Sequence, residues 1–333
     1  MLDVAQAAGV SLKTVSRVIN GEAGVSSDKV TKVEAAIDKL RYARNDIAAS
    51  LRSGVGSSTV GLVIEDVGNP FYARVAQAVE DTAREHSSLL ITTSAREDPA
   101  RERELVTALL RRRVDALLIV PAGRDHRYIA DAGFTGRTVF IDRPSEKTEA
   151  DAVLIDNAAG AQLAVRHMIT HGHRRVALVG DSASLYTARE RLRGYTNALA
   201  AAEIPLDETL ISMEHSTSES ARQAMLELLA LPKKFRPTAI LTANNRCTVG
   251  ALHAGDLRKA GIALVGFDEF ELADLLGITV VRTDPYRMGQ VAAELALGPS
   301  GDAPRPAEDE QRPAQRIVLP VELVVRGSGE VTA

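Results

Sequence analysis

The sequence predicts an α/β protein in which a small all-helical module precedes two lobes, each built on a parallel sheet. The first 44 residues show only helical spacing of apolar residues. From Thr59 onward, short runs of β-branched and aliphatic residues alternate with amphipathic helices, which is the pattern of parallel sheets covered by helices. About nine such runs in roughly 270 residues suit two sheets better than one. A chain of 333 residues is long enough for a small domain and a larger two-lobed one.

The helical module is predicted to be a helix-turn-helix. A helical pattern at the start of the chain ends at Gly9, as a helix does at a left-handed C-cap glycine. Ser11 caps a second helix that runs to Asn20, and Ser26 or Ser27 caps a third. The core of this module is expected to contain Val15, Val18, Ile19, Val30, Val33, Ala36, Ile37 and Leu40. Two helices joined by a tight glycine turn, with a third closing the core, form a helix-turn-helix.

Residues 45–52 predict a short helix between this module and the lobes. The segment is too short to be stable alone, because isolated helices below ~12 residues are marginal in water. Residues 53–58 are rich in Gly and Ser, so we interpret them as a flexible linker.

The strands of the two lobes are predicted from their β-branched runs. They are expected at Val60–Ile64, Leu89–Thr93, Ala116–Val120, Thr138–Ile141, Val153–Ile155, Val176–Val179, Ala239–Leu241, Ala263–Val265, Thr279–Val281, Ile317–Leu319 and Glu322–Val325. Helices are expected between most of them, including Phe71–His86, Glu102–Arg112, Ala158–Thr170, Arg189–Ala202 and Ser218–Leu229. Residues 298–316 are rich in Gly, Pro and charge, which predicts a loop before the last two strands.

Composition and charge exclude several classes of protein. A net charge of −4 argues against a wholly basic nucleic-acid coat, although residues 1–54 carry eight Lys and Arg against six Asp and Glu. Cys247 is the single cysteine, which excludes an intrachain disulfide and a Cys-rich zinc site. No apolar run approaches the ~18 residues of a membrane span, and no signal segment opens the chain. We therefore expect a cytoplasmic protein with no membrane partner.

Sequence signatures of enzymes are not found. No P-loop and no Gly-x-Ser-x-Gly elbow occurs, and Gly54 and Gly56 precede a strand where a dinucleotide fingerprint would follow one. His171 and His173 flank a glycine, but the sequence offers no third metal ligand near them. Their place at a helix end suggests that they satisfy terminal carbonyls. We expect no enzymatic activity, no metal and no cofactor.

A series of short motifs runs through the whole chain in a fixed order. The first is Asp3–Ser11 followed by Thr14–Gly21. The later ones are Asn69–Tyr72, Phe140–Arg143, Ile155–Asn157 with Gly160 and Ala161, His171–Arg175, Arg189–Arg191 with Gly194 and Tyr195, Val265–Asp268, and Leu323–Arg326. Together these motifs resemble the lactose-repressor (LacI/GalR) family of bacterial regulators, and the resemblance covers essentially the whole chain.

The resemblance implies a dimeric DNA-binding transcriptional regulator, a repressor that binds a palindromic operator and is controlled by a small sugar-like effector. It also implies a sensor with the fold of periplasmic sugar-binding proteins, whose chain crosses three times between two Rossmann-like lobes with the ligand in the cleft. The domains that follow are residues 1–44 for the helix-turn-helix, 45–58 for a hinge helix and linker, and 59–333 for effector binding and dimerisation, with lobe 1 at about 59–156 and 285–319 and lobe 2 at about 157–284 and 320–333.

The start of the second helix is expected to contact DNA, because that end of a recognition helix enters the major groove. The expected contacts are Leu12, Lys13, Ser16 and Arg17 for bases, and Thr14, Asn20 and Ser26 for phosphates. Arg17 can bond a guanine bidentately, a contact worth roughly 1–3 kcal/mol of discrimination. Lys13 can read guanine or hold a phosphate, and Leu12 can contact a thymine methyl group. The alternative, a merely solvated helix face, is disfavoured by the surrounding motif.

In the family, a segment matching the short helix folds only when two copies pair on the DNA minor groove. The resemblance assigns to Leu51 the apolar wedge that kinks the duplex, to Ala48 a close approach of the paired helices, and to Asn45 a backbone contact. Effector-driven closure of the lobes would then decide whether the two segments meet. The alternative is a plain linker with Leu51 packed on the sensor.

The sequence departs from the family pattern at two places. Family members usually carry more residues before Asp3, including a capping Thr, and they often have Pro where Arg44 stands.

The resemblance places effector contacts on both lobes. They are expected at Asn69, Phe71, Tyr72, Asp142, Arg143, Arg191, Asn245, Asp268 and Thr283. Planar Arg groups beside carboxylates offer two-point geometry that suits neighbouring hydroxyls. Phe71 is equally compatible with a core position, and Asp142 and Arg143 with pairing to each other. Asn245 and Thr283 stand where many members carry Asp and Gln, so the effector stays open among pentose, hexose, sugar phosphate and nucleoside.

Two other classes of protein share such a scaffold. A solute-binding protein for transport would have a signal segment and no helix-turn-helix, and a sugar-processing enzyme could use Asp142 and Asp268 as its carboxylates. Neither explains a Ser-capped recognition helix followed by a wedge leucine. The sequence leaves open whether the effector induces or co-represses and whether the protein is a dimer or a tetramer.

Overall fold

The computed structural model describes residues 1–19, 22, 24–41, 58–298 and 313–333. Two compact units divide the chain, residues 1–57 and residues 58–333. The predicted hinge residues Asn45, Ala48 and Leu51 and the predicted phosphate contact Asn20 lie outside the described residues. In the described ranges, no helix is long and apolar enough to cross a membrane.

The first unit contains three helices, α1 (Leu2–Ala8), α2 (Leu12–Ile19) and α3 (Ser27–Leu40). Gly9 ends α1 with a φ of 63°, a left-handed conformation that favours glycine. The hydroxyl of Ser11 accepts a hydrogen bond from the backbone N–H of Thr14 at 3.2 Å, which caps α2 as predicted. The predicted helix-turn-helix arrangement is therefore present in this unit.

The core of this unit is small, and two details differ from the prediction. Val15 and Val33 are fully buried at its centre. Leu40, predicted to lie in the core, is the last residue of α3 and has 43% of its surface exposed. Ser26 occupies the N-cap position of α3, but its hydroxyl makes no capping hydrogen bond; its carbonyl accepts from the first turn instead.

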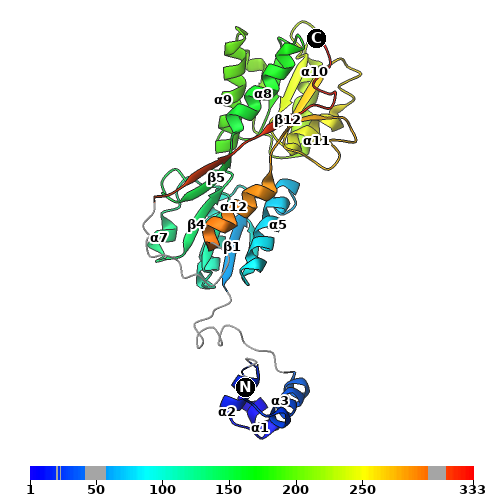
Figure 1. The fold of residues 1–333 in the computed structure, drawn as a ribbon. Coiled ribbons are helices and arrows are strands. Elements are labelled where there is room, and N and C mark those ends of the chain that lie inside the picture. The colour runs from blue at the N-terminus through cyan, green and yellow to red at the C-terminus, as the bar shows by residue number, and fades with distance from the viewer. Residues whose placement is uncertain (20–21, 23, 42–57, 299–312) are drawn as a thin grey trace. The chain divides into compact units, whose positions relative to one another are not determined.

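The second unit contains two six-stranded sheets, one in each lobe (Figure 1). The sheet of lobe 1 has the order β11-β5-β4-β3-β1-β2 and is wholly parallel. Its strands are β1 (Thr59–Ile64), β2 (Leu89–Ser94), β3 (Ala116–Ile119), β4 (Arg137–Ile141), β5 (Asp151–Ile155) and β11 (Arg316–Leu319). The sheet of lobe 2 has the order β12-β10-β9-β8-β6-β7, with only β12 antiparallel to its neighbour. Its strands are β6 (Val176–Val179), β7 (Ile211–Ser212), β8 (Ala239–Thr242), β9 (Ala263–Phe267), β10 (Thr279–Arg282) and β12 (Glu322–Val324).

Helices cover the sheets of both lobes. Those of lobe 1 are α5 (Pro70–Glu85), α6 (Pro99–Arg111), α7 (Tyr128–Asp131) and α12 (Pro285–Leu297). Those of lobe 2 are α8 (Asn157–Thr170), α9 (Tyr186–Ala201), the short 3-10 helix η1 (Glu208–Leu210), α10 (Ser218–Ala230) and α11 (Asn245–Ala254). The predicted strands are confirmed to within about two residues at their ends. The short elements β7, α7 and η1 were not predicted, because two to four residues are too few to show a periodicity.

The chain passes between the two lobes three times. It crosses after β5 into α8, after β10 into α12, and between β11 and β12 (Figure 1). The two sheets have the same order of strands when they are compared position by position. Strand β4 of lobe 1 is equivalent to β9 of lobe 2, and β5 is equivalent to β10. Each of the first two crossings thus leaves from an equivalent strand and delivers a helix to the other lobe.

Glycines in both lobes let pairs of helices pack closely. A Cβ atom at Gly194 of α9 would lie 2.1 Å from the carbonyl oxygen of Ala158 in α8. A Cβ atom at Gly289 of α12 would lie 2.3 Å from the carbonyl oxygen of Val75 in α5. Both obstacles are backbone atoms, so neither contact can be relieved by turning a side chain.

We expect Gly194→Ala to destabilise the second unit by about 1–3 kcal/mol, because α8 and α9 would have to move apart. Chemical denaturation of the full chain measures this change. Gly68→Ala is the matched control, since a Cβ atom there meets nothing closer than a side-chain atom of Asp66 at 3.4 Å. Equal stability of the two variants would show that the helices separate without cost.

Candidate functional site

The start of α2 exposes the side chains predicted to contact DNA. Leu12 and Lys13 are exposed, and Ser16 is partly exposed beside them. The hydroxyl of Thr14 lies 2.9 Å from that of Ser11, so it takes part in the cap of α2. The guanidinium of Arg17 approaches the carboxylate of Glu22 at 3.4 Å. This surface therefore offers an apolar side chain and two cations within two turns of one helix.

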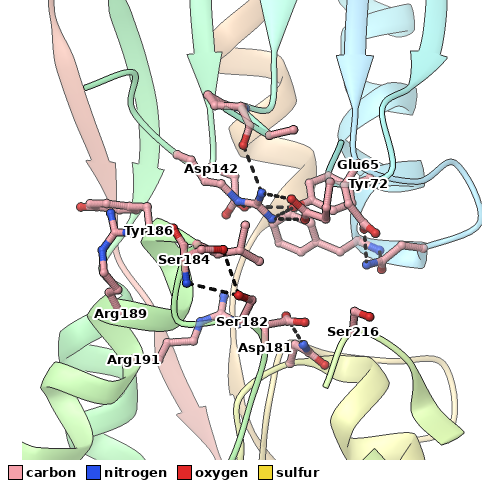
Figure 2. Close-up of a pocket in the computed structure, with 18 of the residues that line it drawn as sticks. Glu65, Tyr72, Asp142, Asp181, Ser182, Ser184, Tyr186, Arg189, Arg191 and Ser216 are labelled. Atoms are coloured by element: carbon pink, nitrogen blue, oxygen red, sulfur yellow. Dashed lines mark hydrogen bonds and ion pairs between the residues drawn. The ribbon is translucent and has the colours of Figure 1, made fainter. Parts of the chain in front are cut away.

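A cavity of about 580 Å³ lies between the two lobes of the second unit (Figure 2). Its polar lining comes from segments that follow the carboxyl ends of parallel strands. Glu65 follows β1 and Asp142 follows β4 in lobe 1, while Asp181 follows β6 and Asp268 follows β9 in lobe 2. Ligands of open α/β sheets bind at this edge, because loops and helix starts converge there.

Arg143 organises the lobe 1 wall of the cavity. Its two terminal nitrogens donate to the two carboxylate oxygens of Glu97, each at 2.6 Å, in a bidentate pair. One of them also donates to the carbonyl of Pro121 at 3.1 Å, and the other to the hydroxyl of Tyr72 at 3.3 Å. Tyr72 in turn donates to Asp142 at 3.0 Å. The wall is therefore one connected network of charged and polar groups.

Two buried atoms of this network have no hydrogen-bond partner within the described part of the chain. They are Oδ1 of Asp142 and Nε of Arg143. Arg143 Nε approaches Asp142 Oδ2 at 3.5 Å, so the two side chains attract each other, but most of the guanidinium is directed to Glu97. A buried acceptor and a buried donor that lack partners are costly unless a ligand supplies them.

Arg191 organises the lobe 2 wall. Its Nε donates to Asn157 at 2.7 Å, one terminal nitrogen donates to the carbonyl of Ala243, and its guanidinium lies 3.8 Å from the centre of the Phe267 ring. The same terminal nitrogen lies 3.7 Å from Asp268, close enough for attraction. Arg191 is 6% exposed, and these contacts fix its orientation toward the cavity (Figure 2).

Asp142 and Asp268 occupy equivalent places in the two lobes and share a rare backbone conformation. Their φ angles are 67° and 69°. The backbone N–H of Asp142 donates to Val153 on the next strand, and that of Asp268 donates to the equivalent Val281. Left-handed conformations of non-glycine residues cost of order 1–3 kcal/mol and gather at functional sites. The strain turns both carboxylates toward the cavity from opposite sides.

Burial raises the pKa of several carboxyl groups of the cavity. The pKa of Asp268 is raised to about 6 by burial first, and the charges of Asp142 and Asp181 add to this effect, while Arg191 opposes it. Burial likewise raises the pKa of Asp142 and Asp181 above the ordinary value. The cavity thus holds acids that are costly to ionise beside arginines that remain charged.

Polar contacts join the two lobes along one edge of the cavity. Nδ2 of Asn245 donates to Oδ1 of Asn69 at 2.9 Å. Arg246 donates to Glu65 at 2.9 Å and to Asp66 at 2.6 Å. On another side, Arg189 donates to Glu146 of lobe 1 at 3.2 Å. The lobes therefore contact each other directly through charged side chains.

The structure brings eight of the nine predicted effector residues to this cavity. They are Asn69, Phe71, Tyr72, Asp142, Arg143, Arg191, Asn245 and Asp268. Thr283 does not line it; its hydroxyl donates to Asp268 from behind, at 3.2 Å, and it borders a second hollow instead. Phe71 is buried in an apolar cluster and also lines the cavity, so its position is compatible with both interpretations.

The sequence reasoning missed polar residues that line the cavity. The main ones are Glu65, Glu97, Asp181, Asn244, Arg189 and Arg246. Glu65 directly follows a predicted strand, and Asp181 and Asn244 stand within three residues of one. Their position at the carboxyl ends of strands could therefore have identified them. Glu97 and Arg246 give no such signal, because only the folded loops bring them to the cavity.

The two histidines considered as metal ligands have other roles. Nδ1 of His171 bonds the carbonyl of His167 at 2.9 Å. His173 is fully buried and bonds the hydroxyl of Thr238 at 3.0 Å and the carbonyl of Val331 at 2.6 Å. They thus join the end of α8 to the C-terminal segment.

Comparison with known proteins gives matches over the whole chain. A model of bacterial regulatory proteins of the lacI family matches residues 1–45, and a model of a periplasmic binding protein-like domain matches residues 165–329. The HTH-type transcriptional regulator GalR of Salmonella typhimurium is 32% identical over 91% of this chain and 90% of its own. A structure of the transcriptional regulator CelR in complex with cellobiose is 30% identical, with a TM-score of 0.70 over 98% of each chain. A structure of the lac repressor dimer bound to operator and the anti-inducer ONPF is 26% identical, with a TM-score of 0.80 over 99% of this chain and 98% of its own.

The raised pKa of Asp268 makes the stability of the fold depend on pH. Since its folded pKa of about 6 exceeds the ordinary value of 3.8, the folded protein binds the proton more tightly than the unfolded chain. Stability therefore falls as the pH rises from about 4 to about 6 and stays lower above it. Asp268→Asn, which resembles the protonated form, is expected to be more stable than the wild type by about 1–3 kcal/mol near pH 7.5 and equally stable near pH 4.

Chemical denaturation at the two pH values checks this expectation. Asp131→Asn, at an exposed position of α7, is the control and should change stability at neither pH. Destabilisation of Asp268→Asn at both pH values would contradict the assignment, because it would mean that the loss of a partner for Arg191 outweighs the relief of the buried charge.

Proposed function

Since the chain belongs to the lacI family of bacterial regulatory proteins and is a DNA-binding transcriptional regulator, we propose that its cleft binds a neutral, sugar-like effector that sets its affinity for a palindromic operator. The regulator acts as a homodimer and as a repressor. Its site of action is the cytoplasm, where a bacterial operator lies. It is a binding protein and not an enzyme.

The observation that carries the proposal is the unpartnered Oδ1 of Asp142, buried in the wall of the cavity. A buried carboxylate oxygen without a donor is stabilised by a ligand hydroxyl that donates to it. Arg143 Nε is the unpartnered donor beside it, and a hydroxyl can also accept. A pair of neighbouring hydroxyl groups supplies both functions at once, which is the chemistry of a sugar ring.

The charges around the cavity favour a neutral effector over a phosphorylated one. Asp142, Asp181 and Asp268 all have pKa values raised first by burial, so charged groups in this cavity are poorly solvated. A phosphate group would add like charge in a poorly solvated place. A neutral polyol adds only hydroxyl donors and acceptors. The aromatic side chains of Phe71 and Tyr72, in edge-to-face contact at 5.1 Å, form an apolar part of the lining.

The first unit supplies the DNA-binding half of the proposal. Leu12, Lys13, Ser16 and Arg17 contact bases, and Thr14, Asn20 and Ser26 contact phosphates. Asn45, Ala48 and Leu51 act at the minor groove between two half-sites. A single helix-turn-helix reads only one half-site, so a palindromic operator calls for two copies of the chain. The solved lac repressor is a dimer on its operator, which supports the same assembly here.

Arg17→Ala is expected to relax the base preference at one position in each half-site, because a bidentate contact to guanine would be lost. Selection of random duplex DNA by the variant and by the wild type, followed by sequencing, measures this. Thr31→Ala, on the outer side of α3, is the control and should leave the selected sequence unchanged. A uniform loss of affinity for all sequences would instead make Arg17 a phosphate contact.

The selection itself tests the proposed function. We expect the wild-type chain to enrich a palindrome with a flexible pyrimidine–purine step at its centre. The enriched duplex then serves as the probe for a panel of neutral pentoses, hexoses and disaccharides, with their phosphates as a second panel. A change in DNA affinity only with the phosphorylated panel would overturn the proposed effector class.

Asp142→Asn is expected to weaken binding of the active sugar by about 10- to 100-fold, because an uncharged amide oxygen is a weaker acceptor of hydroxyl hydrogens than a carboxylate. Operator binding without effector should be unchanged. Isothermal titration with the active sugar measures the first effect and DNA titration the second. Asp131→Asn again serves as control, and unchanged sugar affinity in Asp142→Asn would place the effector elsewhere.

A further inference from the structure

The first turn of α11 in lobe 2 reaches across to the loop between β1 and α5 in lobe 1. Asn245 donates to Asn69 at 2.9 Å, and Arg246 donates to Glu65 at 2.9 Å and to Asp66 at 2.6 Å. The donors of these three hydrogen bonds are two consecutive residues of lobe 2. The acceptors lie within a segment of five residues in lobe 1. We call this group of side chains the latch.

The side of the latch in lobe 2 is firmly held. Asn244 is the N-cap of α11, and its side-chain oxygen accepts from the backbone N–H of Cys247 at 2.7 Å. The amide nitrogen of Asn244 donates to Asp181 at the floor of the cavity. Because the turn is fixed at both of these points, Asn245 and Arg246 have a defined direction toward lobe 1.

The bond between Asn245 and Asn69 works only with an amide at position 245. Oδ1 of Asn69 is an acceptor in this contact and also accepts from the backbone N–H of Phe71 at 3.1 Å. A carboxylate at position 245 has no hydrogen to donate. It would also add a fourth acidic group near Glu65, Asp66 and Asp181, which already line this part of the cleft or its edge. Asn245 therefore has a chemical reason to be an amide that involves no ligand.

Arg246 forms the charged part of the latch and is partly shielded from water. Its side chain is 28% exposed, and that of Glu65 is only 10% exposed. Pairs shielded in this way are screened less by salt than pairs on the open surface. The two terminal nitrogens of its planar guanidinium each bind a different carboxylate of one loop, in a fixed geometry that the single ammonium of a lysine does not have.

We propose that Asn245 and Arg246 are positioning residues that hold the two lobes at this angle, and that they set effector affinity through the lobe angle more than through contact with the effector. The lobes that close over a ligand are here joined by the protein's own side chains. Loss of the latch favours a wider lobe angle. In the wider form, one wall of the binding site is displaced. We call the form with the lobe angle of this structure the narrow form. Only the narrow form binds the effector fully, so the apparent affinity falls in proportion to the fraction of molecules in that form.

The latch is independent of the proposed effector, and only its consequence for affinity rests on the proposed function. The lobe angle can therefore be measured without any effector. Cys247 is fully buried, and burial raises the pKa of its thiol, so it does not compete for thiol-directed labels. Glu104 on α6 in lobe 1 and Lys233 after α10 in lobe 2 are exposed, and cysteines introduced there can carry a pair of spin labels.

The experiment compares label distances in the full chain for the wild type, Asn245→Asp and Arg246→Met. We expect both latch variants to shift the distance distribution away from that of the wild type, with the population of the displaced form rising about tenfold. Arg222→Met is the control, because it breaks an exposed ion pair with Glu219 that lies wholly within α10. Wild-type distributions in both latch variants would overturn the proposal.

A second measurement separates positioning from ligand contact. With the neutral sugar found by the operator assay, both latch variants should bind more weakly by the factor by which the narrow form is depleted. If Asn245 were instead a hydroxyl acceptor, Asn245→Asp would bind the sugar as tightly as the wild type or more tightly, and the proposal would be wrong for this residue. If no sugar on the panel binds, the proposed function fails, while the label distances still decide whether the latch exists.

Discussion

Burial of charge between the lobes is the constraint on which the rest of the structure depends. Asp142, Arg143, Arg191 and Asp268 are all less than about one-tenth exposed, and an isolated ion in such a place costs several kcal/mol. Partners therefore have to be built in: Glu97 takes both terminal nitrogens of Arg143, and the guanidinium of Arg191 is shared among other polar groups. Among the described residues of this wall, Oδ1 of Asp142 and Nε of Arg143 are left without a hydrogen-bond partner.

The same constraint explains why the two lobes are alike. Equivalent strands β4 and β9 end in aspartates with nearly equal left-handed φ angles, although the sequence around them shows no obvious repeat. What repeats is the backbone path, because the carboxyl end of a parallel strand is where a loop can turn a side chain into the cleft. The first two crossings leave from equivalent strands, and one buried apolar cluster contains residues of both lobes beside a separate cluster in each.

The fold could be predicted because it rests on local patterns, and the residues in the deep part of the site because they belong to motifs of the family. Buried parallel strands such as β3 and β8 read as apolar runs, and Asp142 and Asp268 belong to recognisable motifs at strand ends. Contacts across the cleft could not be predicted. Arg246 contacts Glu65 only when segments 181 residues apart in the sequence are brought together. The hydroxyl of Thr283 is oriented by its hydrogen bond to Asp268, which its place in the sequence does not indicate. The contacts of these residues depend on the tertiary structure and leave no periodic pattern in the sequence.

A sensor needs two lobe angles of similar free energy, and polar contacts provide this better than apolar ones. Moving a two-state equilibrium from 1:99 to 99:1 takes about 5.5 kcal/mol of differential binding, which a small polyol can just supply. An apolar contact between the lobes would be gained at every closure and would hold the cleft shut whether or not a ligand were bound. In the pair of Arg246 and Glu65, attraction and the cost of removing both charges from water oppose each other. Because these two contributions oppose each other, the net stabilisation from the pair is modest, and differential binding of a ligand can outweigh it.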